Sequence, residues 1–355
     1  MTRVLVTGAA GFIARGSLAR LAHAGHEVHA VSSRPVLAGG PGTGAAGRVG
    51  SPALEEPHTA LAQVRWHRAD LLGEGSASEL MRAVAPTHLL HMAWCTEPGT
   101  FWTAPENLDW AQASLRLLRA FAAGGGRRAV IAGTCTEYEW RRHTHCVEER
   151  GPQGGPDTRG PARQATPRAP HTLYGAAKHA VHLVAERYAE QAGFELAWGR
   201  VFYTYGPHEH PARLASSVAS ALVRGEQVRC TDGAQVRDYT YVAELGEAFA
   251  ALLDSPATGA VNMASGEPVR VADLVLALAA AAGRPELVRL GALPRRPDEP
   301  ERLTADVGRL REQVGWSASV GLREGAERTV EWWRRELAPG ASGDGRVRAG
   351  AGQAR

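Results

Sequence analysis

The chain has 355 residues, of which 44% are hydrophobic, so it can bury one large core or two modest ones. Its formal net charge is only +3, and its basic residues are scattered rather than gathered in a stripe with aromatic residues, which argues against nucleic-acid binding. The four cysteines form no C-x-x-C pair, and no apolar run reaches membrane-spanning length. We therefore expect a soluble, cytoplasmic protein with reduced thiols and no membrane partner.

Apolar runs that predict strands alternate with amphipathic runs that predict helices through the first two thirds of the chain. Strands are predicted at Arg3–Thr7, Glu27–Val31, Val64–His67, His88–His91, Ala129–Ala132 and Glu195–Val201. Helices are predicted at Phe12–Ala24, Ser78–Val84, Leu108–Ala122, Tyr174–Ala192, Ala212–Arg224, Val242–Leu253, Val271–Ala282 and Leu322–Leu337. This alternation indicates an α/β fold with a doubly wound parallel (Rossmann) sheet, which binds ligands beyond the carboxyl ends of its strands.

Three segments fit neither a helix nor a strand. Two of them, Pro35–Pro57 and Gly151–Pro170, are rich in Gly and Pro and predict surface loops. The second loop lies just before Tyr174, so it either covers a pocket or is an insertion without a role. The small, polar, glycine-rich segment 338–355 predicts a disordered tail.

A glycine turn follows the first predicted strand and opens the first predicted helix. The run Gly8-Ala9-Ala10-Gly11-Phe12-Ile13-Ala14 has the position of a turn whose backbone N–H groups bind a pyrophosphate at a helix N-terminus. Its spacing, Gly8-x-x-Gly11-x-x-Ala14, differs from the form G-x-G-x-x-G, and Ala14 stands in the third glycine place. Gly8, Gly11, Phe12 and Ile13 are therefore predicted to bind a dinucleotide, the alternative being an ordinary strand-to-helix turn.

The residues after the second predicted strand favour NADPH over NADH. A site for NAD usually places an acid there to bind the ribose 2′-hydroxyl, whereas this chain has Ser32, Ser33 and Arg34. Hydroxyls and a guanidinium supply hydrogen-bond donors and a positive charge that match a 2′-phosphate. Alternatively, Arg34 is a solvated loop residue and the cofactor is NAD. Asp70, after the third strand, is expected to contact the adenine amino group.

Tyr174 and Lys178 stand four residues apart on one predicted helix, so their side chains share a face. A phenol with an ordinary pKa near 10 is a poor acid or base unless positive charge nearby favours the phenolate. Lys178 is the only lysine among 40 basic residues, which suggests a place where a broad guanidinium would fail. Alternatively, the single lysine reflects a composition biased towards arginine, and the two side chains form a solvent-exposed pair.

These motifs resemble the extended short-chain dehydrogenase/reductase superfamily, in its nucleotide-sugar epimerase/dehydratase branch. The resemblance covers about residues 2–337. It rests on these segments: Thr7–Ala14, Asp70-Leu71, His91-Met92-Ala93, Thr134 to Tyr138, Tyr174 to Lys178, Arg200 to Pro207 and Arg237-Asp238-Tyr239. The resemblance implies a smaller C-terminal substrate-binding lobe. The implied division is 1–203 with about 236–264 for the dinucleotide domain, and about 204–235 with 265–337 for the lobe.

The resemblance also implies roles for single residues. The catalytic set becomes Thr134, Tyr174 and Lys178, with Thr134 as the hydroxyl that binds the reacting substrate oxygen; its alternative role is to cap the backbone. Leu71, Met92 and Ala93 are added to the cofactor contacts, and the substrate contacts implied are Thr134, Thr136, Tyr203, Arg237 and Arg296. The two arginines would bind the diphosphate of a nucleotide sugar, unless they are surface cations. The helices at 108–122 and 174–192 would pair across a two-fold axis into a homodimer.

Departures from the family pattern narrow the reaction. Dehydratases of the family place an acid directly after the catalytic Thr, where this chain has Cys135 and Thr136, so dehydration is disfavoured. The 3,5-epimerising relatives carry a cysteine in the place of Thr136. His143, His145 and Cys146 lack a fourth ligand and are interpreted as loop residues near the pocket mouth rather than a metal site.

We therefore expect an NADPH-dependent reductase of a nucleotide-linked 4-keto-6-deoxyhexose, with Tyr174 as the proton donor. One alternative is a nucleotide-sugar 4-epimerase with tightly bound NAD. An alternative of another class is a non-catalytic dinucleotide-binding regulator.

Overall fold

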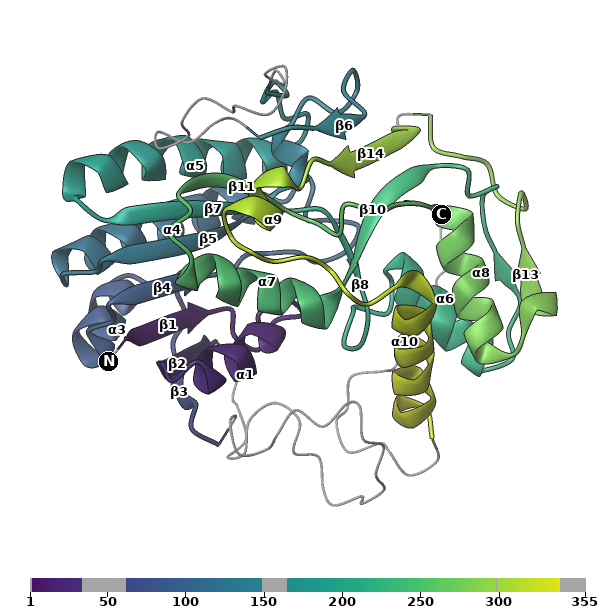
Figure 1. The fold of residues 1–355 in the computed structure, drawn as a ribbon, viewed down its shortest axis with the longest axis horizontal. Coiled ribbons are helices and arrows are strands. Elements are labelled where there is room, and N and C mark those ends of the chain that lie inside the picture. The colour runs from purple at the N-terminus through teal and green to yellow at the C-terminus, as the bar shows by residue number, and fades with distance from the viewer. Residues whose placement is uncertain (1, 34–61, 149–164, 298, 339–355) are drawn as a thin grey trace.

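The computed structural model describes residues 2–33, 62–148, 165–297 and 299–338. Seven parallel strands form the central sheet in the order β11-β7-β5-β4-β1-β2-β3 (Figure 1). Their bounds are β1 Arg3–Thr7, β2 Glu27–Ser32, β3 Arg65–Arg68, β4 His88–His91, β5 Arg128–Thr134, β7 Glu195–Val201 and β11 Gly259–Met263. The predicted doubly wound α/β sheet is confirmed.

Helices cover both faces of this sheet, because side chains along each strand point alternately to opposite faces. In β1, Val4 and Val6 pack on the side of α1 and α7, whereas Leu5 packs on the side of α3, α4 and α5. The bounds of these helices are α1 Arg15–His23, α3 Ser76–Val84, α4 Glu106–Ala123, α5 Leu173–Ala192 and α7 Val242–Asp254. The inner strands of the sheet are therefore buried on both faces, whereas the edge strand β3 is polar and partly exposed.

Two glycines let α1 and α7 approach closely. A Cβ on Gly246 would lie 2.6 Å from the backbone of Gly16, a distance that real Cβ atoms do not show. Sequence analysis placed the third glycine position of the turn at Ala14, which is buried here. The close approach occurs two residues later, at Gly16, so a methyl group at Ala14 is tolerated.

The buried Arg128 of β5 ties the end of α7 to the sheet. Its guanidinium donates hydrogen bonds to the carbonyl oxygens of Leu252, Leu253 and Ala257, at 2.7 to 2.9 Å. Carbonyl groups at a helix C-terminus lack partners within the helix, and a cation there is favourable. This contact fixes where the chain leaves α7 and returns to the sheet as β11.

A second unit contains a mixed sheet and three packed helices, on the right in Figure 1. The sheet order is β12-β10-β14-β6, with β8 paired to β10, and β9 pairs separately with β13. The strands are β6 His145–Cys146, β8 Tyr203–Tyr205, β9 Val228–Arg229, β10 Val236–Tyr241, β12 Pro268–Arg270, β13 Val288–Arg289 and β14 Arg302–Ala305. The helices are α6 Leu214–Val223, α8 Val271–Ala282 and α10 Leu322–Glu336, and a short α9 Gly308–Glu312 precedes α10.

The chain passes several times between the two sheets, first where β6 follows β5 and last where β12 follows β11. β10 belongs to the second sheet, whereas α7 and β11, which follow it, join the central one. Sequence analysis assigned 236–264 as a block to the dinucleotide domain. The division into domains stays a prediction. Within the predicted block 236–264, β10 is the segment that pairs with strands of the second sheet.

Some predictions fall outside the described residues, and one is wrong. Most of the Pro35–Pro57 and Gly151–Pro170 loops and of the 338–355 tail lie outside them. His145 and Cys146 are not loop residues, because they form β6 and pair with Thr304 and Ala305 of β14. His143 does lie in the preceding loop.

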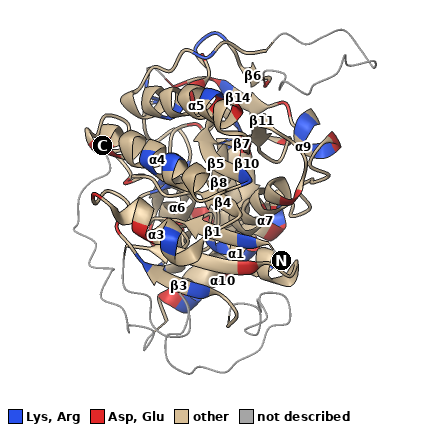
Figure 2. Ribbon diagram, turned by 90° about the vertical axis from the view of Figure 1, so that its left-hand side faces the viewer, with Lys and Arg blue, Asp and Glu red and all other residues tan. Residues whose placement is uncertain are grey.

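Charged residues of both signs are interspersed over the side of the molecule that Figure 2 presents. Among the described residues, no helix has the length and apolar character needed to cross a bilayer.

Candidate functional site

The glycine turn after β1 lies where the strand order of the central sheet reverses, between β1 and β4. Gly8 has φ +65°, and a Cβ on it would lie 2.8 Å from the backbone nitrogen of Ala93, so only glycine fits there. The Gly11 N–H donates to the Gly8 carbonyl oxygen at 2.7 Å, which closes the turn, and the half-buried Phe12 and Ile13 follow. A tight turn before a helix at this crevice fits the diphosphate of a dinucleotide.

A hydrogen-bond chain joins the ends of β1 and β4 to α4. The Thr7 hydroxyl lies 2.7 Å from His91 Nδ1, and His91 Nε2 lies 2.9 Å from the Ser114 hydroxyl. Burial, and to a smaller extent the nearby Lys178, lower the pKa of His91 to about 3, so the imidazole is neutral. The Thr7 oxygen also accepts the N–H groups of Met92 and Ala93. The backbone at Met92 and Ala93 is therefore held directly beside the glycine turn.

The predicted adenine and ribose contacts lie at the ends of β2 and β3. Ser32 is buried at the end of β2, and Ser33 is exposed beyond it. Asp70 is exposed and accepts the Leu72 N–H at 3.1 Å, while Leu71 is buried. Arg34 lies outside the described residues, so the predicted contact with a 2′-phosphate stays a prediction.

The predicted catalytic residues meet at the end of β5 and the start of α5. The Thr134 side chain lies close enough to Tyr174 to lower the pKa of its phenol. The Thr134 hydroxyl accepts the Thr136 N–H at 3.3 Å and lies 3.1 Å from the Thr136 hydroxyl. Lys178 Nζ donates to the Ala132 carbonyl oxygen at 2.8 Å. All these side chains are at least 90% buried. Gly175 permits this approach, because a Cβ on it would lie 2.6 Å from the Thr136 carbonyl oxygen.

The charge states of these groups differ from the sequence-based expectation. We expected positive charge to lower the pKa of the Tyr174 phenol, but burial raises it above its ordinary value, and the nearby Thr134 side chain offsets only part of the rise. Burial also lowers the pKa of Lys178 to about 7, which Glu137 partly opposes. The spacing of the two residues did not reveal how far both are removed from water. At neutral pH, the phenol of Tyr174 is protonated.

Glu137 organises the loop that carries Thr134. One of its oxygens accepts the Thr134 backbone N–H at 2.8 Å and the Trp198 indole N–H at 2.9 Å. The other accepts a hydrogen bond from Arg200 Nε at 3.0 Å, and both side chains of this ion pair are fully buried. Arg200 also donates to the Tyr138 hydroxyl at 3.0 Å. This carboxylate is therefore occupied by donors from three directions.

Glu137, His179 and His182 lie close enough together to suggest a metal site. However, the Arg200 guanidinium already contacts the carboxylate and lies 3.3 Å from His182 Nδ1, so a metal cation would meet a buried positive charge. We assign Glu137 and His182 to the ion-pair network of Arg200.

The predicted diphosphate-binding arginines differ in environment. Arg237 is 1% exposed, pairs with Glu299 at 2.8 Å and lies over the Tyr203 ring at 5.3 Å, so it is no surface cation. Arg296 is exposed, and its carbonyl oxygen accepts the Glu299 N–H. Burial raises the pKa of the Tyr203 phenol to about 12.

An aromatic wall that the sequence pattern did not predict lies beside Tyr174. Phe101, Trp102 and Trp94 meet the tyrosine ring edge-on, with ring centroids 5.0, 6.0 and 6.4 Å away. Trp94 directly follows the His91-Met92-Ala93 motif, and this position was the one signal that could have drawn attention to it. The wall encloses one side of the candidate site.

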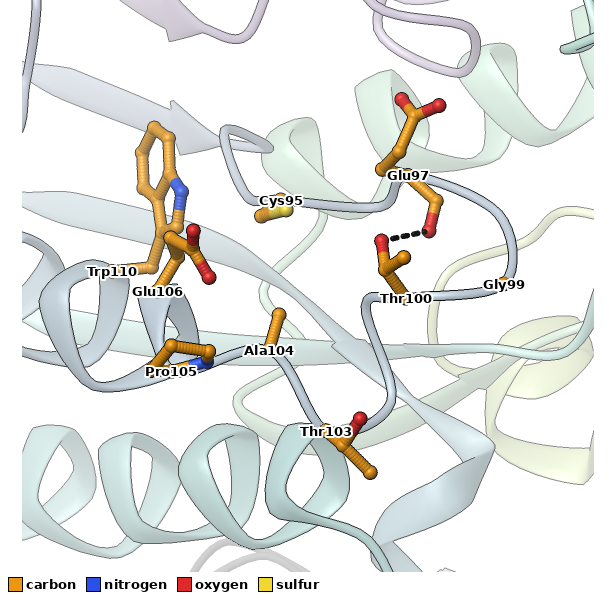
Figure 3. Close-up of a pocket in the computed structure, with 9 residues that line it drawn as sticks. All are labelled: Cys95, Glu97, Gly99, Thr100, Thr103, Ala104, Pro105, Glu106 and Trp110. Atoms are coloured by element: carbon orange, nitrogen blue, oxygen red, sulfur yellow. Dashed lines mark hydrogen bonds between the residues drawn. The ribbon is translucent and has the colours of Figure 1, made fainter.

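A cavity of about 600 Å³ borders this wall (Figure 3). Trp110 and Glu106 project from the start of α4 on one side of it, and Glu97 lies on the loop opposite. The Trp110 ring stacks on Trp94 at 6.4 Å. None of the predicted site residues is among those that line the cavity, which are Cys95, Glu97, Gly99, Thr100, Thr103, Ala104, Pro105, Glu106 and Trp110.

Comparison with known sequences relates the chain to enzymes that modify nucleotide sugars. Residues 4–264 match the family described as NAD dependent epimerase/dehydratase. A dTDP-4-dehydro-6-deoxy-D-allose reductase from Streptomyces sp is 27% identical over 341 residues, covering 93% of this chain and 96% of that protein. UDP-glucuronic acid decarboxylase 1 from Xenopus tropicalis is 28% identical over 177 residues, 48% of this chain and 41% of that protein. The chain thus spans less than half the length of the decarboxylase.

Solved structures share the whole architecture. UDP-glucose 4-epimerase from Thermotoga maritima, with UDP-glucose, has a TM-score of 0.72 at 22% identity, covering 95% of this chain and all of that one. UDP-glucose 4-epimerase from Thermus thermophilus, with NAD, has a TM-score of 0.69 at 25% identity, covering 94% of this chain and 99% of that one.

Proposed function

Because the chain belongs to the NAD dependent epimerase/dehydratase family, we propose that it is an NADPH-dependent reductase of a nucleotide-linked 4-keto-6-deoxyhexose. The observation that carries the proposal is the placement of Tyr174, a buried phenol that is protonated at neutral pH and lies beside Thr134. Reduction of a ketone needs a proton donor, and a protonated phenol is one. Oxidation of an alcohol, with which an epimerase begins, needs a base instead.

The chain's own residues divide the work as follows. A bound nicotinamide cofactor supplies the hydride. Tyr174 donates a proton to the oxygen of the sugar ketone, and Thr134 orients that oxygen through its hydroxyl. Lys178 would hold the nicotinamide ribose of the bound cofactor through its ammonium group. Thr136, Tyr203, Arg237 and Arg296 would contact the nucleotide sugar.

The cofactor contacts follow from the same proposal. The turn from Gly8 to Ile13 would hold the diphosphate, and Met92, Ala93 and Leu71 would flank the cofactor. Ser32, Ser33 and Arg34 would contact a 2′-phosphate, with Asp70 at the adenine. NADPH is favoured for the charge match at Arg34, and comparing kcat/KM for NADPH and NADH tests that preference.

The position of Glu137 also disfavours dehydration. Elimination of water needs an acid and a base near the sugar, and Glu137 is the carboxylate close to Thr134 in the chain. Its oxygens already accept from Thr134, Trp198 and Arg200. The full-length relative from Streptomyces sp, a reductase of a dTDP-linked 4-keto-6-deoxy sugar by its name, supports the same reaction.

A 4-epimerase with tightly bound NAD is the second candidate, because the two solved structures named above are UDP-glucose 4-epimerases. A non-catalytic dinucleotide-binding regulator would bind cofactor without turnover. NADPH absorbance, followed with a panel of dTDP-, GDP-, CDP- and UDP-4-keto-6-deoxy sugars, separates the three. We expect oxidation with at least one sugar, whereas interconversion of epimers without oxidation would establish the epimerase.

We further propose a homodimer built on α4 and α5. These helices pack side by side, and Leu108, Leu183 and Val184 expose 60%, 42% and 51% of their surface. Apolar side chains on two neighbouring helices suit a self-complementary four-helix interface.

A further inference from the structure

The indole ring of Trp94 covers the ammonium of the only lysine in the chain. Lys178 Nζ lies 3.8 Å from the ring centroid, within the range of a cation–π interaction, for which tryptophan is the best aromatic partner. On another side, the same ammonium donates to the Ala132 carbonyl oxygen. Lys178 is 3% exposed, so little water takes part in its contacts.

The indole ring is itself held in place. Its Nε1–H donates to the Asn107 side-chain oxygen at 2.9 Å. The Asn107 amide donates in turn to the carbonyl oxygens of Phe101 and Ala104, at 2.7 and 2.8 Å, and Asn107 is fully buried. Turning the indole would break a hydrogen bond to a buried group, which is costly.

We propose that Trp94 is a positioning residue for Lys178, holding the ammonium between its ring face and the Ala132 carbonyl so that the cofactor ribose meets it in one orientation. A lysine side chain is flexible and its ammonium rotates freely, so a fixed site needs contacts on more than one side. The inference rests on the proposed function, which gives Lys178 the cofactor ribose as its partner.

The surroundings of Lys178 also make its charge depend on Trp94. Facing it are Glu137 from the turn after β5, His91 from β4 and Tyr174 from α5. Glu137 favours the ammonium, while His91 and Tyr174 are neutral near pH 7. Burial lowers the pKa of Lys178 to about 7, and the ring face favours the charged form. An aliphatic side chain in the same space would therefore lower this pKa further.

The test is cofactor binding as a function of pH, with isothermal titration of NADPH from pH 6 to 9. In the wild type, binding should weaken as pH rises through about 7, because the ammonium is lost. Trp94→Leu should weaken binding about tenfold at pH 7.5 and move the onset of weakening down by about one pH unit, since a tenfold change and one pKa unit are the same free energy. Trp94→Phe should lie between the two.

Two controls separate positioning from a structural role. Trp110→Leu removes the neighbouring ring of the same stack and should leave the pH dependence unchanged. In a Lys178→Met background, Trp94→Leu should cause no further loss, because the cation it acts on is gone.

The inference is overturned if Trp94→Leu keeps the wild-type pH dependence, if Trp110→Leu shifts it equally, or if the loss persists in the Lys178→Met background. These results do not depend on sugar turnover. An absence of turnover with intact cofactor binding would contradict the reductase alone, and an unchanged Trp94→Leu titration would contradict the positioning role alone.

Discussion

Two buried cations lie near Glu137, Lys178 on α5 and Arg200 on β7, and they differ in whether a carboxylate pairs with them. Arg200 pairs with Glu137 at 3.0 Å and also binds the Tyr138 hydroxyl. Lys178 has a carbonyl oxygen and an indole face, and no described carboxylate lies within ion-pair distance of it. A buried cation without a carboxylate partner costs stability and is retained where its charge is needed. This difference supports a structural role for Arg200 and the proposed chemical role for Lys178.

The largest effect should follow from removing the proton donor beside Lys178. Tyr174→Phe should lower kcat about a thousandfold, the scale of a lost general acid, while cofactor affinity stays within about twofold. NADPH oxidation and calorimetric titration measure the two quantities. Near-normal turnover in this variant would remove Tyr174 from its role.

Glu137→Gln should affect the other cation. It removes the carboxylate charge that faces the buried Arg200 guanidinium, and breaking a buried ion pair in this way typically costs about 3 kcal/mol of unfolding free energy. Denaturant unfolding measures the loss. Glu195→Gln is the matched control, because its partner Arg128 is buried but Glu195 is 59% exposed, so its loss should be much smaller. Equal losses would refute the structural assignment of the Glu137–Arg200 pair.

Lys178 should affect stability and cofactor binding with opposite pH trends. Its pKa is about 7 in the folded protein and near the ordinary 10.5 when unfolded. Between those values, the unfolded chain holds a proton that the folded protein has released, so the free energy of unfolding rises with pH relative to Lys178→Met. Thermal unfolding of the cofactor-free wild type and variant at pH 6.5 and 9 measures this gain. If the difference in unfolding temperature between wild type and Lys178→Met is the same at both pH values, the pKa of Lys178 is not lowered in the folded protein.

The smallest effect on the isolated subunit should come from a surface change remote from both cations. Val184→Glu places a charge on the proposed dimer face and should convert a dimer to a monomer with little loss of fold stability. Light scattering after size-exclusion chromatography measures the mass. Leu276→Glu, on the exposed face of α8, is the control and should leave the mass unchanged. A wild type that is monomeric at micromolar concentration would exclude the interface.

The sequence predicted well those elements that local pattern determines. The bounds of β1, β4, β7 and α8 match the predicted ranges, because their apolar periods and flanking turns are read within the element itself. The glycine turn was located for the same reason. Short strands such as β6 and β14 were missed, since they form by pairing with distant segments: β6 with β14 more than 150 residues away, and β14 also with β10.

Long-range contacts account for what the sequence did not predict in the site. The spacing of Tyr174 and Lys178 placed them on one helical face, but their burial comes from β5 and from the 94–102 segment, which reverses the expected direction of the Tyr174 pKa. Glu299 was not foreseen as the partner of Arg237, because the two residues are 62 positions apart. Residue type and spacing identify candidate site residues. Their charge states depend on how the folded chain packs around them.

The most direct test of the central claim is the fate of the cofactor hydrogen. With NADPH deuterated at C4 and an accepted nucleotide 4-keto-6-deoxy sugar, the account predicts one deuterium on the former ketone carbon for each cofactor oxidised, detected by mass spectrometry and NMR. Turnover of the sugar with no net oxidation of the cofactor would contradict a reductase.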